Sequence, residues 1–498
     1  MFEPTFASLG GYECPDWFRD AKFGIWSHWG PQSVPMCGDW YARHMYVEGS
    51  QQYLYHLRHY GHPSKFGYKD IVKLWKAEAF DPAGLMALYH RAGARYFVAQ
   101  AMHHDHFFNY PSKLNRFNSM DMGPGKDIVG MWKTAAEQYS LPFGLTEHLG
   151  ASFSWWAVNK GSDKSGPYAG VPYDGSDPAY SDFYFENTEH ITENGNIHLW
   201  YTLNEKYHAY WLAVMRELIG LYQPDLLYTD GALPFGSHWC EDEASKKTYA
   251  GDALYTCGLE AAARLYNASI EKYGENRAVY TQKDRRPEIH RVGVLDIEKS
   301  QLPGIQERPW QTDTCIGGWF YDAKRPFKKP GHIIEMLVDI VSKNGTMLLN
   351  ILQRPDGAID DEARWILGEL AGWFAACGEG IYSTRPWRAC GEGPSGASSK
   401  PFCEDEVEWT SSDIRFTRKG NTLYAFLMRA ASPAGPDENG VAVIKSLTPD
   451  ERVRAVRLLG GGALEFAQSF GVLTVKLPEK LPTGYVNCLA LEMEAIDN

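Results

Sequence analysis

The 498-residue sequence lacks several features that would place it in a large class of proteins. No run approaches about 18 consecutive apolar residues, so we expect no transmembrane span and no membrane partner. The N-terminus has no basic segment followed by an apolar run, so no signal peptide is visible. We therefore expect a cytoplasmic enzyme by default, although a periplasmic or secreted chain that had lost its leader would look the same.

Other missing features argue against several kinds of site, partner and enzyme. The nine cysteines are scattered and contain no C-x-x-C pair, which argues against a zinc finger or a disulfide framework. The net charge is −13 and no Lys/Arg cluster stands out, so we expect no nucleic-acid partner. A G-x-S-x-G elbow, a P-loop, and a G-x-G-x-x-G after the first apolar segment are all missing. Serine hydrolases, P-loop nucleotide hydrolases and Rossmann dehydrogenases are thereby disfavoured.

Aromatic residues, in contrast, are abundant: 17 Trp, 29 Tyr and 23 Phe. Their flat apolar faces stack on sugar rings and on bases, and the acidic charge balance favours sugars. The same residues also fill large cores, so their number alone does not decide the function.

Short apolar segments alternate with amphipathic ones over the first 380 residues. This alternation predicts a parallel sheet covered by helices, and we expect a (β/α)8 TIM-like barrel with one strand not identified. We expect strands at residues 22–29, 94–102, 141–149, 225–231, 277–282, 292–298 and 346–352, and helices at 81–93, 126–140, 206–222 and 330–345. Beyond a Gly/Ser/Pro-rich loop, short alternating segments predict an all-β sandwich, giving domains at 1–385 and 386–498.

The expected strands end in a repeated set of polar residues. Barrel enzymes carry their chemistry at the C-terminal ends of the strands, so these residues should meet at one mouth. Imidazoles donate and accept hydrogen bonds, and indoles stack on sugar carbons, which together suit a neutral polyol. The residues at these ends are His28, His103, His104, His148, Asp230 and Glu298.

A metal site is the main alternative for the stretch "HHDH". His104 and His106 form an H-x-H pair, a spacing that zinc hydrolases with barrel folds use. His28, His148 and Asp230 could supply further ligands from other strand ends. Spacing alone leaves a metal-dependent barrel hydrolase open.

Six segments, in order over residues 14–388, resemble the α-L-fucosidases of glycoside hydrolase family 29. "WFRDAKFGIWSHWGPQSVP" and "DWYARHMY" resemble the opening of these enzymes, and "YFVAQAMHHDHFFNYPSKLNRFNSMDMGPGKDIVG" resembles a later His-rich segment of the family. "PDLLYTDG" resembles the strand that carries the family's nucleophilic aspartate. "SKNGTMLLNILQRPDGAIDD" and "GEGIYSTRPW" resemble the last strand and the exit from the barrel.

The resemblance implies a retaining exo-α-L-fucosidase that needs no cofactor and no metal. It would release terminal α-linked L-fucose from glycans through a covalent glycosyl-enzyme. Asp230 corresponds to the nucleophile. Glu298 is our acid/base, with Glu288 and Asp313 as the other candidates.

The resemblance also implies a sugar-binding set. Its members are His28, Trp40, Tyr41, His103, His104, His148 and Trp319. The family usually has Gly at the position of His106, whose role is left open. A non-catalytic fucose-binding barrel is the alternative from another class of protein, and a homo-oligomer is compatible with the sequence.

Overall fold

Eight parallel strands close into a barrel in the computed structural model, with β1 hydrogen-bonded to both β2 and β8. The structure describes residues 1–187, 200–236, 255–429 and 440–494, except the side chains of 287 and 288. The barrel strands are β1 (Phe23–Ser27), β2 (Phe97–Met102), β3 (Phe143–Glu147), β4 (Leu226–Thr229), β5 (Val279–Gln282), β6 (Val294–Asp296), β7 (Trp310–Cys315) and β8 (Gly345–Asn350). The predicted barrel is confirmed.

The strand that the sequence did not reveal is β7, "WQTDTC". Its polar residues point to partners inside the barrel: the Gln311 amide donates to Asp296 at 2.8 Å and its oxygen accepts from Tyr96 at 2.9 Å. A buried strand can carry polar side chains when each finds a hydrogen-bond partner. The apolar run that marked the other strands is therefore absent here.

In the part of the chain that the structure describes, six longer helices accompany the strands: α6 (Pro82–Arg91), α7 (Ile128–Glu137), α10 (Glu205–Tyr222), α12 (Thr256–Tyr273), α14 (Pro330–Ser342) and α15 (Asp361–Cys377). Three begin where a side chain caps free backbone amides: Asp81 accepts from Gly84, Asp127 from Gly130, and Asn204 from two amides. The four helices expected from the sequence correspond to α6, α7, α10 and α14.

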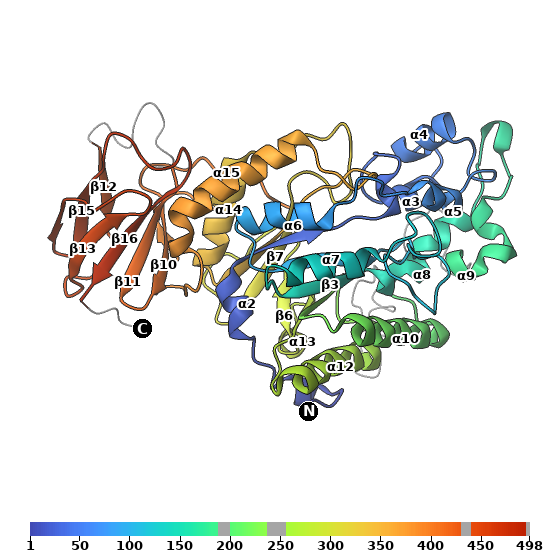
Figure 1. Cartoon of the computed structure of the whole chain (residues 1–498), viewed down its shortest axis with the longest axis horizontal. Coiled ribbons are helices and arrows are strands. Elements are labelled where there is room, and N and C mark those ends of the chain that lie inside the picture. Colours follow the sequence, from blue (N-terminus) through green and yellow to red (C-terminus); the bar gives the residue numbers. More distant parts are fainter. Residues whose placement is uncertain (188–199, 237–254, 430–439, 495–498) are drawn as a thin grey trace.

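Eight shorter helices are present among the described residues. They are α1 (Phe6–Leu9), α2 (Asp16–Ala21), α3 (Tyr41–His44), α4 (Gln51–His59), α5 (Tyr68–Ile71), α8 (Ser152–Trp155), α9 (Ser181–Tyr184) and α13 (Pro287–His290). Helices α3, α4, α5, α8 and α9 gather at the end opposite the C-terminal sheets (Figure 1). They lie in the long connections after β1 and β3, so they extend the chain beyond the C-terminal ends of the strands. None of the described helices is long and apolar enough to cross a membrane.

Two antiparallel sheets follow the barrel, as the sequence predicted. Their strands are β9 (Gly391–Glu392), β10 (Ile414–Lys419), β11 (Thr422–Leu427), β12 (Val441–Ile444), β13 (Val453–Leu458), β14 (Phe466–Ser469), β15 (Val472–Lys476) and β16 (Asn487–Met493). One sheet has the order β13-β16-β11-β10-β9 and the other β12-β15-β14. Side chains from both sheets, such as Leu489 and Leu473, share one core.

The larger sheet is buried on both faces. Leu423 and Ala425 of β11 point into the core between the two sheets, whereas Tyr424 and Phe426 belong to the core of the barrel region. This period of two is the alternation expected of a strand. Helices α14 and α15 lie between the barrel and the sheets (Figure 1), so the β region covers one side of the barrel.

Candidate active site

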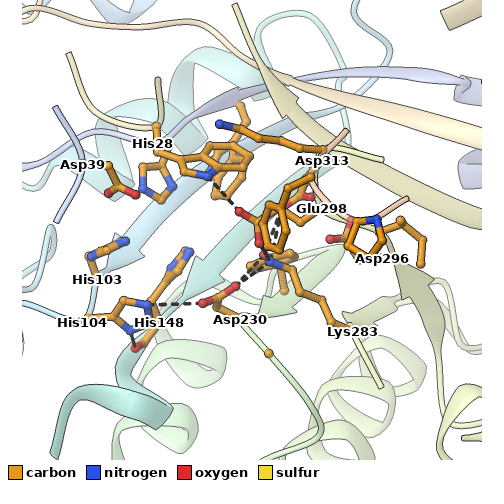
Figure 2. Close-up of a pocket in the computed structure, with 18 of the residues that line it drawn as sticks. His28, Asp39, His103, His104, His148, Asp230, Lys283, Asp296, Glu298 and Asp313 are labelled. Carbon is orange, nitrogen blue, oxygen red and sulfur yellow. Dashed lines mark hydrogen bonds and ion pairs between the residues drawn. The ribbon is translucent and has the colours of Figure 1, made fainter. Parts of the chain in front are cut away.

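A cavity of about 650 Å³ opens at the C-terminal ends of the barrel strands (Figure 2). Seven of the eight strands contribute to its polar lining, through residues within two positions of each strand's C-terminal end. These residues are His28 (β1), His103 and His104 (β2), His148 (β3), Asp230 (β4), Lys283 (β5), Glu298 (β6) and Asp313 (β7). The ring of polar residues expected from the sequence therefore lies in one cavity.

Lys283 is surrounded by carboxylates. Its Nζ donates to Asp230 Oδ1 at 2.8 Å and to Glu298 Oε2 at 2.5 Å, and it lies 3.8 Å from Asp313 Oδ2. Burial acts to lower the pKa of Lys283, but the neighbouring negative charges raise it well above its usual value. One ammonium group thus holds three carboxyl groups at one end of the cavity.

Asp230 is held in its ionised form. Its second oxygen, Oδ2, lies 3.3 Å from His104 Nε2, and the Nδ1 of that histidine is 2.6 Å from the carbonyl oxygen of His148. Burial acts to raise the pKa of Asp230, but Lys283 and His104 hold it well below its usual value. An ionised carboxylate that faces a cavity can attack an electrophilic carbon.

The Tyr228 hydroxyl lies between two carboxyl groups. It is 3.0 Å from Asp230 Oδ1 and 3.1 Å from Asp313 Oδ2, but it has only one proton to donate. Burial, together with the charge of Glu298, raises the pKa of Asp313 to about 6. Below that pH, Asp313 can donate to Tyr228, and Tyr228 can donate to Asp230.

Glu298 is the more accessible of the two candidate acids. Its side chain is 20% exposed, against 1% for Asp313. The Trp319 indole donates to Glu298 Oε1 at 2.9 Å, so Trp319 and Lys283 together fix the orientation of this carboxyl group. The side chain of Glu288, the third candidate, lies outside the described residues.

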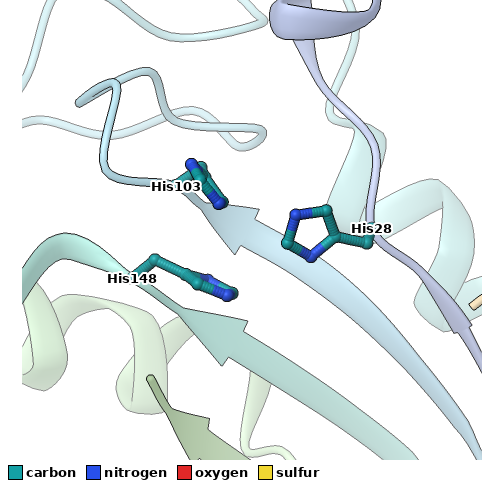
Figure 3. Close-up of side chains that lie close together, drawn as sticks. All are labelled: His28, His103 and His148. Atoms are coloured by element: carbon teal, nitrogen blue, oxygen red, sulfur yellow. The ribbon is translucent and has the colours of Figure 1, made fainter. Parts of the chain in front are cut away.

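Three imidazoles converge at the ends of the first three strands (Figure 3). One nitrogen each of His28, His103 and His148 lies within 4.8 Å of the other two. Both ring nitrogens of His28 and Nδ1 of His148 have no hydrogen-bond partner among the described residues, whereas His103 Nδ1 is 2.8 Å from Gln32 Nε2. Burial lowers the pKa of each, to about 3 for His148. Neutral imidazoles suit sugar hydroxyls, and equally a transition-metal ion.

Aromatic residues form a wall beside the histidines. Trp40 stacks on Trp200, with ring centroids 6.2 Å apart, and both line the cavity together with Asp39. Burial raises the pKa of Asp39 to about 6.

Tyr41 is the one expected sugar-binding residue that does not line the cavity: it is fully buried, and its hydroxyl donates to His56 at 2.7 Å.

His106 does not line the cavity either, so the H-x-H pair does not converge on one site. Its Nδ1 donates to the Phe183 carbonyl at 3.0 Å, and its Nε2 then accepts from the Tyr210 hydroxyl at 2.7 Å. Burial lowers its pKa to about 4. His106 thus ties the loop after β2 to α9 and α10, and a metal site built on His104 and His106 has no geometric support.

Several cavity residues had not been singled out from the sequence as members of the site, among them Asp39, Tyr228, Lys283 and Asp296. Two of them carried a usable signal. Lys283 directly follows an expected strand, and Tyr228 lies two residues before Asp230, on the same face of β4. Asp296 depends on its contacts with β7, the strand that was not identified.

Comparisons with known proteins agree with this geometry. The family model described as alpha-L-fucosidase matches residues 1–379. Tissue alpha-L-fucosidase from Homo sapiens is 27% identical over 456 residues, covering 89% of this chain and 81% of that protein. The enzyme of the same name from Rattus norvegicus is 27% identical over 494 residues, covering 97% and 90%.

Solved structures show the same likeness over the whole length. The crystal structure of Thermotoga maritima alpha-fucosidase in complex with fucose has a TM-score of 0.71 and 25% sequence identity, and covers 99% of this chain and 100% of that one. The resemblance drawn from the sequence is confirmed. Because the family model matches far more than half of its residues, this chain belongs to the alpha-L-fucosidase family of glycoside hydrolases.

Proposed function

We propose that the chain is a retaining exo-α-L-fucosidase, with Asp230 as nucleophile and Glu298 as acid/base. The observation that carries the mechanism is the bridge formed by Lys283. Its two hydrogen bonds, laid end to end, limit the separation of Asp230 Oδ1 and Glu298 Oε2 to about 5.3 Å. Retaining glycosidases have carboxyl groups about 5 to 5.5 Å apart, whereas inverting ones need roughly 6.5 Å or more.

The proposed reaction has two steps. Asp230 attacks the anomeric carbon, the bond to the leaving oxygen breaks, and protonated Glu298 gives its proton to that oxygen. Glu298 then takes a proton from water, the water oxygen attacks the same carbon, and the bond to Asp230 breaks. Asp313 remains the other candidate acid, since its pKa of about 6 suits proton transfer near neutral pH.

Fucose would be held by the imidazoles and the aromatic wall. The free ring nitrogens of His28 and His148 can accept or donate to sugar hydroxyls, and His103 and His104 lie beside them. Trp40 and Trp319 offer apolar faces to the ring and its methyl group. A cavity of about 650 Å³ at the end of the barrel suits a terminal sugar of a fucosylated glycan. We further propose residues 1–385 as the catalytic domain and 386–498 as a second domain.

Hydrolysis of an aryl α-L-fucoside by Asp230→Ala and Glu298→Ala tests the assignment. Both variants should lose most of their activity, and azide should rescue each with a different product. Azide would replace the nucleophile in Asp230→Ala and give the β-fucosyl azide, whereas Glu298→Ala would give the α-anomer. Unchanged activity in Asp230→Ala would refute the mechanism. Rescue of Asp313→Ala in place of Glu298→Ala would transfer the acid role to Asp313.

A metal-dependent hydrolase is the second candidate, because His28, His103 and His148 could supply three nitrogen ligands. In that case a strong chelator would abolish activity, and stoichiometric zinc would be found by elemental analysis. In a retaining fucosidase, chelation leaves the rate unchanged. A fucose-binding barrel without catalysis would bind fucose with no turnover at all.

A further inference from the structure

One wall of the cavity comes from outside the barrel. Pro401 and Phe402, which lie between α15 and β10, line the same cavity as Asp230 and Glu298. The Phe402 side chain is large and apolar, yet the residue is 66% exposed. An exposed aromatic ring at the mouth of a binding cavity is available to stack on a ligand.

Phe402 is presented by backbone that is attached to the barrel on both sides. Before it, the Lys400 carbonyl accepts a hydrogen bond from the Ser300 hydroxyl at 2.7 Å. After it, the Glu404 carboxylate accepts from Lys328 Nζ at 2.6 Å, and the Glu404 carbonyl is 3.0 Å from His332 Nε2. These contacts fix the position of the segment 400–404 relative to the loops after β6 and β7.

The same contacts place Phe402 on the Glu298 side of the cavity. Ser300, which holds Lys400, is two residues beyond Glu298 in the chain. Between them, Lys299 lines the cavity, and its Nζ lies 4.7 Å above the ring of Trp319, the indole that donates to Glu298. An acid that protonates the leaving oxygen must face the leaving group. The leaving group therefore occupies the side of the cavity that Phe402 and Lys299 line.

We propose that Phe402 and Pro401 form the binding site for the sugar from which fucose is released. A pyranose ring presents an apolar C–H face that stacks on the Phe402 ring, and the Lys299 ammonium donates a hydrogen bond to one of its hydroxyls. This inference rests on the proposed fucosidase function and adds to it the chemical class of the leaving group. Phe402 determines specificity and takes no part in bond cleavage.

Two substrates with the same fucosyl group allow the role of Phe402 and the fucosidase function to be tested separately. One is a disaccharide with fucose α-linked to a pyranose, and the other is α-L-fucosyl fluoride, whose leaving group has no ring. For Phe402→Ala we expect kcat/KM on the disaccharide to fall about three- to tenfold, the range typical of one lost ring contact. The rate on the fluoride should not change. Phe402→Trp should retain the disaccharide activity.

Phe470→Ala is the matched control. Phe470 is also exposed, at 92%, and like Phe402 it has a positive φ, but it lies in the turn between β14 and β15 and does not line the cavity. This variant should behave as wild type on both substrates.

An equal loss on both substrates in Phe402→Ala would overturn the inference, because it would mean that the residue acts on the fucosyl site. An unchanged rate on the disaccharide would overturn it as well. A wild-type chain that cleaves neither substrate would refute the fucosidase function itself. The wild-type assay therefore tests that function before any variant is compared.

Discussion

Lys283 is the residue on which the electrostatics of the cavity depend. It is the cation that offsets the charges of Asp230, Glu298 and Asp313 within 3.8 Å of its Nζ. For a buried carboxylate, desolvation and a nearby cation act in opposite directions on the pKa. In Asp230 the cation and the hydrogen bond from His104 together outweigh burial. We regard Lys283 as a positioning residue that keeps Asp230 ionised.

Replacing Lys283 by Met should therefore raise the pKa of Asp230, because burial would no longer be offset by an adjacent ammonium. A raised pKa means that Asp230 takes up a proton at higher pH, so the acidic limb of the kcat/KM profile should move to higher pH. For each unit by which the pKa of Asp230 rises, its ionised fraction falls about tenfold at pH values below the new pKa. The measurement is a pH–rate profile on an aryl α-L-fucoside.

Lys283→Arg keeps the charge and serves as the control. It should lose some activity through altered geometry but keep the acidic limb near the wild-type position. If the acidic limb of Lys283→Met coincided with that of wild type, Lys283 would have no part in ionising Asp230.

At the scale of elements, strand β1 depends on a glycine at the barrel interior. A Cβ at Gly24 would lie 2.3 Å from the Tyr96 ring, and the Tyr96 hydroxyl is held by Gln311 of β7 at 2.9 Å. Because the ring is fixed at its far end and fully buried, it cannot move aside without breaking contacts across the barrel. The glycine is thus required by packing, since its backbone conformation is ordinary.

Gly24→Ala should destabilise the protein by about 1 to 3 kcal/mol, the usual cost of overpacking a core. Gly368→Ala is the matched control. Gly368 lies in the middle of α15, and a Cβ there meets nothing within 4 Å, so alanine should stabilise the helix by about 1 kcal/mol. In urea unfolding, the free energy of unfolding should fall in Gly24→Ala and rise in Gly368→Ala. Equal stability of Gly24→Ala and wild type would contradict the packing argument.

The elements also show why one strand could not be read from the sequence. Apolar runs mark strands that are buried on both faces, and seven of the eight barrel strands follow that pattern. β7 is buried too, but Gln311 and Asp313 point toward partners on other strands. Their polarity is tolerated because those partners exist, and the partners are brought together only when the barrel closes.

At the scale of the whole molecule, a buried ionic cluster joins the barrel to the C-terminal sheets. Asp339 of α14 accepts from Lys343 at 2.7 Å and from Arg415 of β10 at 2.5 Å, and Asp339 is fully buried. One carboxylate therefore balances two cations at this interface. Removing the single anion leaves both cations uncompensated, whereas removing one cation leaves a neutral pair.

Asp339→Asn should accordingly destabilise the protein by about 3 to 5 kcal/mol, as expected when a buried charge loses its partner. Arg415→Met should cost less, because the Asp339–Lys343 pair remains and the Met side chain fills much of the same volume. Urea unfolding of both variants tests this order. A greater loss in Arg415→Met than in Asp339→Asn would show that packing, and not charge balance, holds the interface.

The sequence by itself determined the fold class and the ring of strand-end residues. The spacing of apolar residues and the helix caps are local properties that can be read along the chain. Strand ends of a parallel barrel must meet at one mouth, so the residues that follow the strands could be predicted to lie together; they include His28, His103, His148 and Asp230. Tertiary structure alone decided the rest. Lys283 is a bridge only because three carboxylates from β4, β6 and β7 surround it. Phe402 lines the cavity only because its segment folds back onto the barrel, since no local pattern encodes contacts between residues so far apart in the chain.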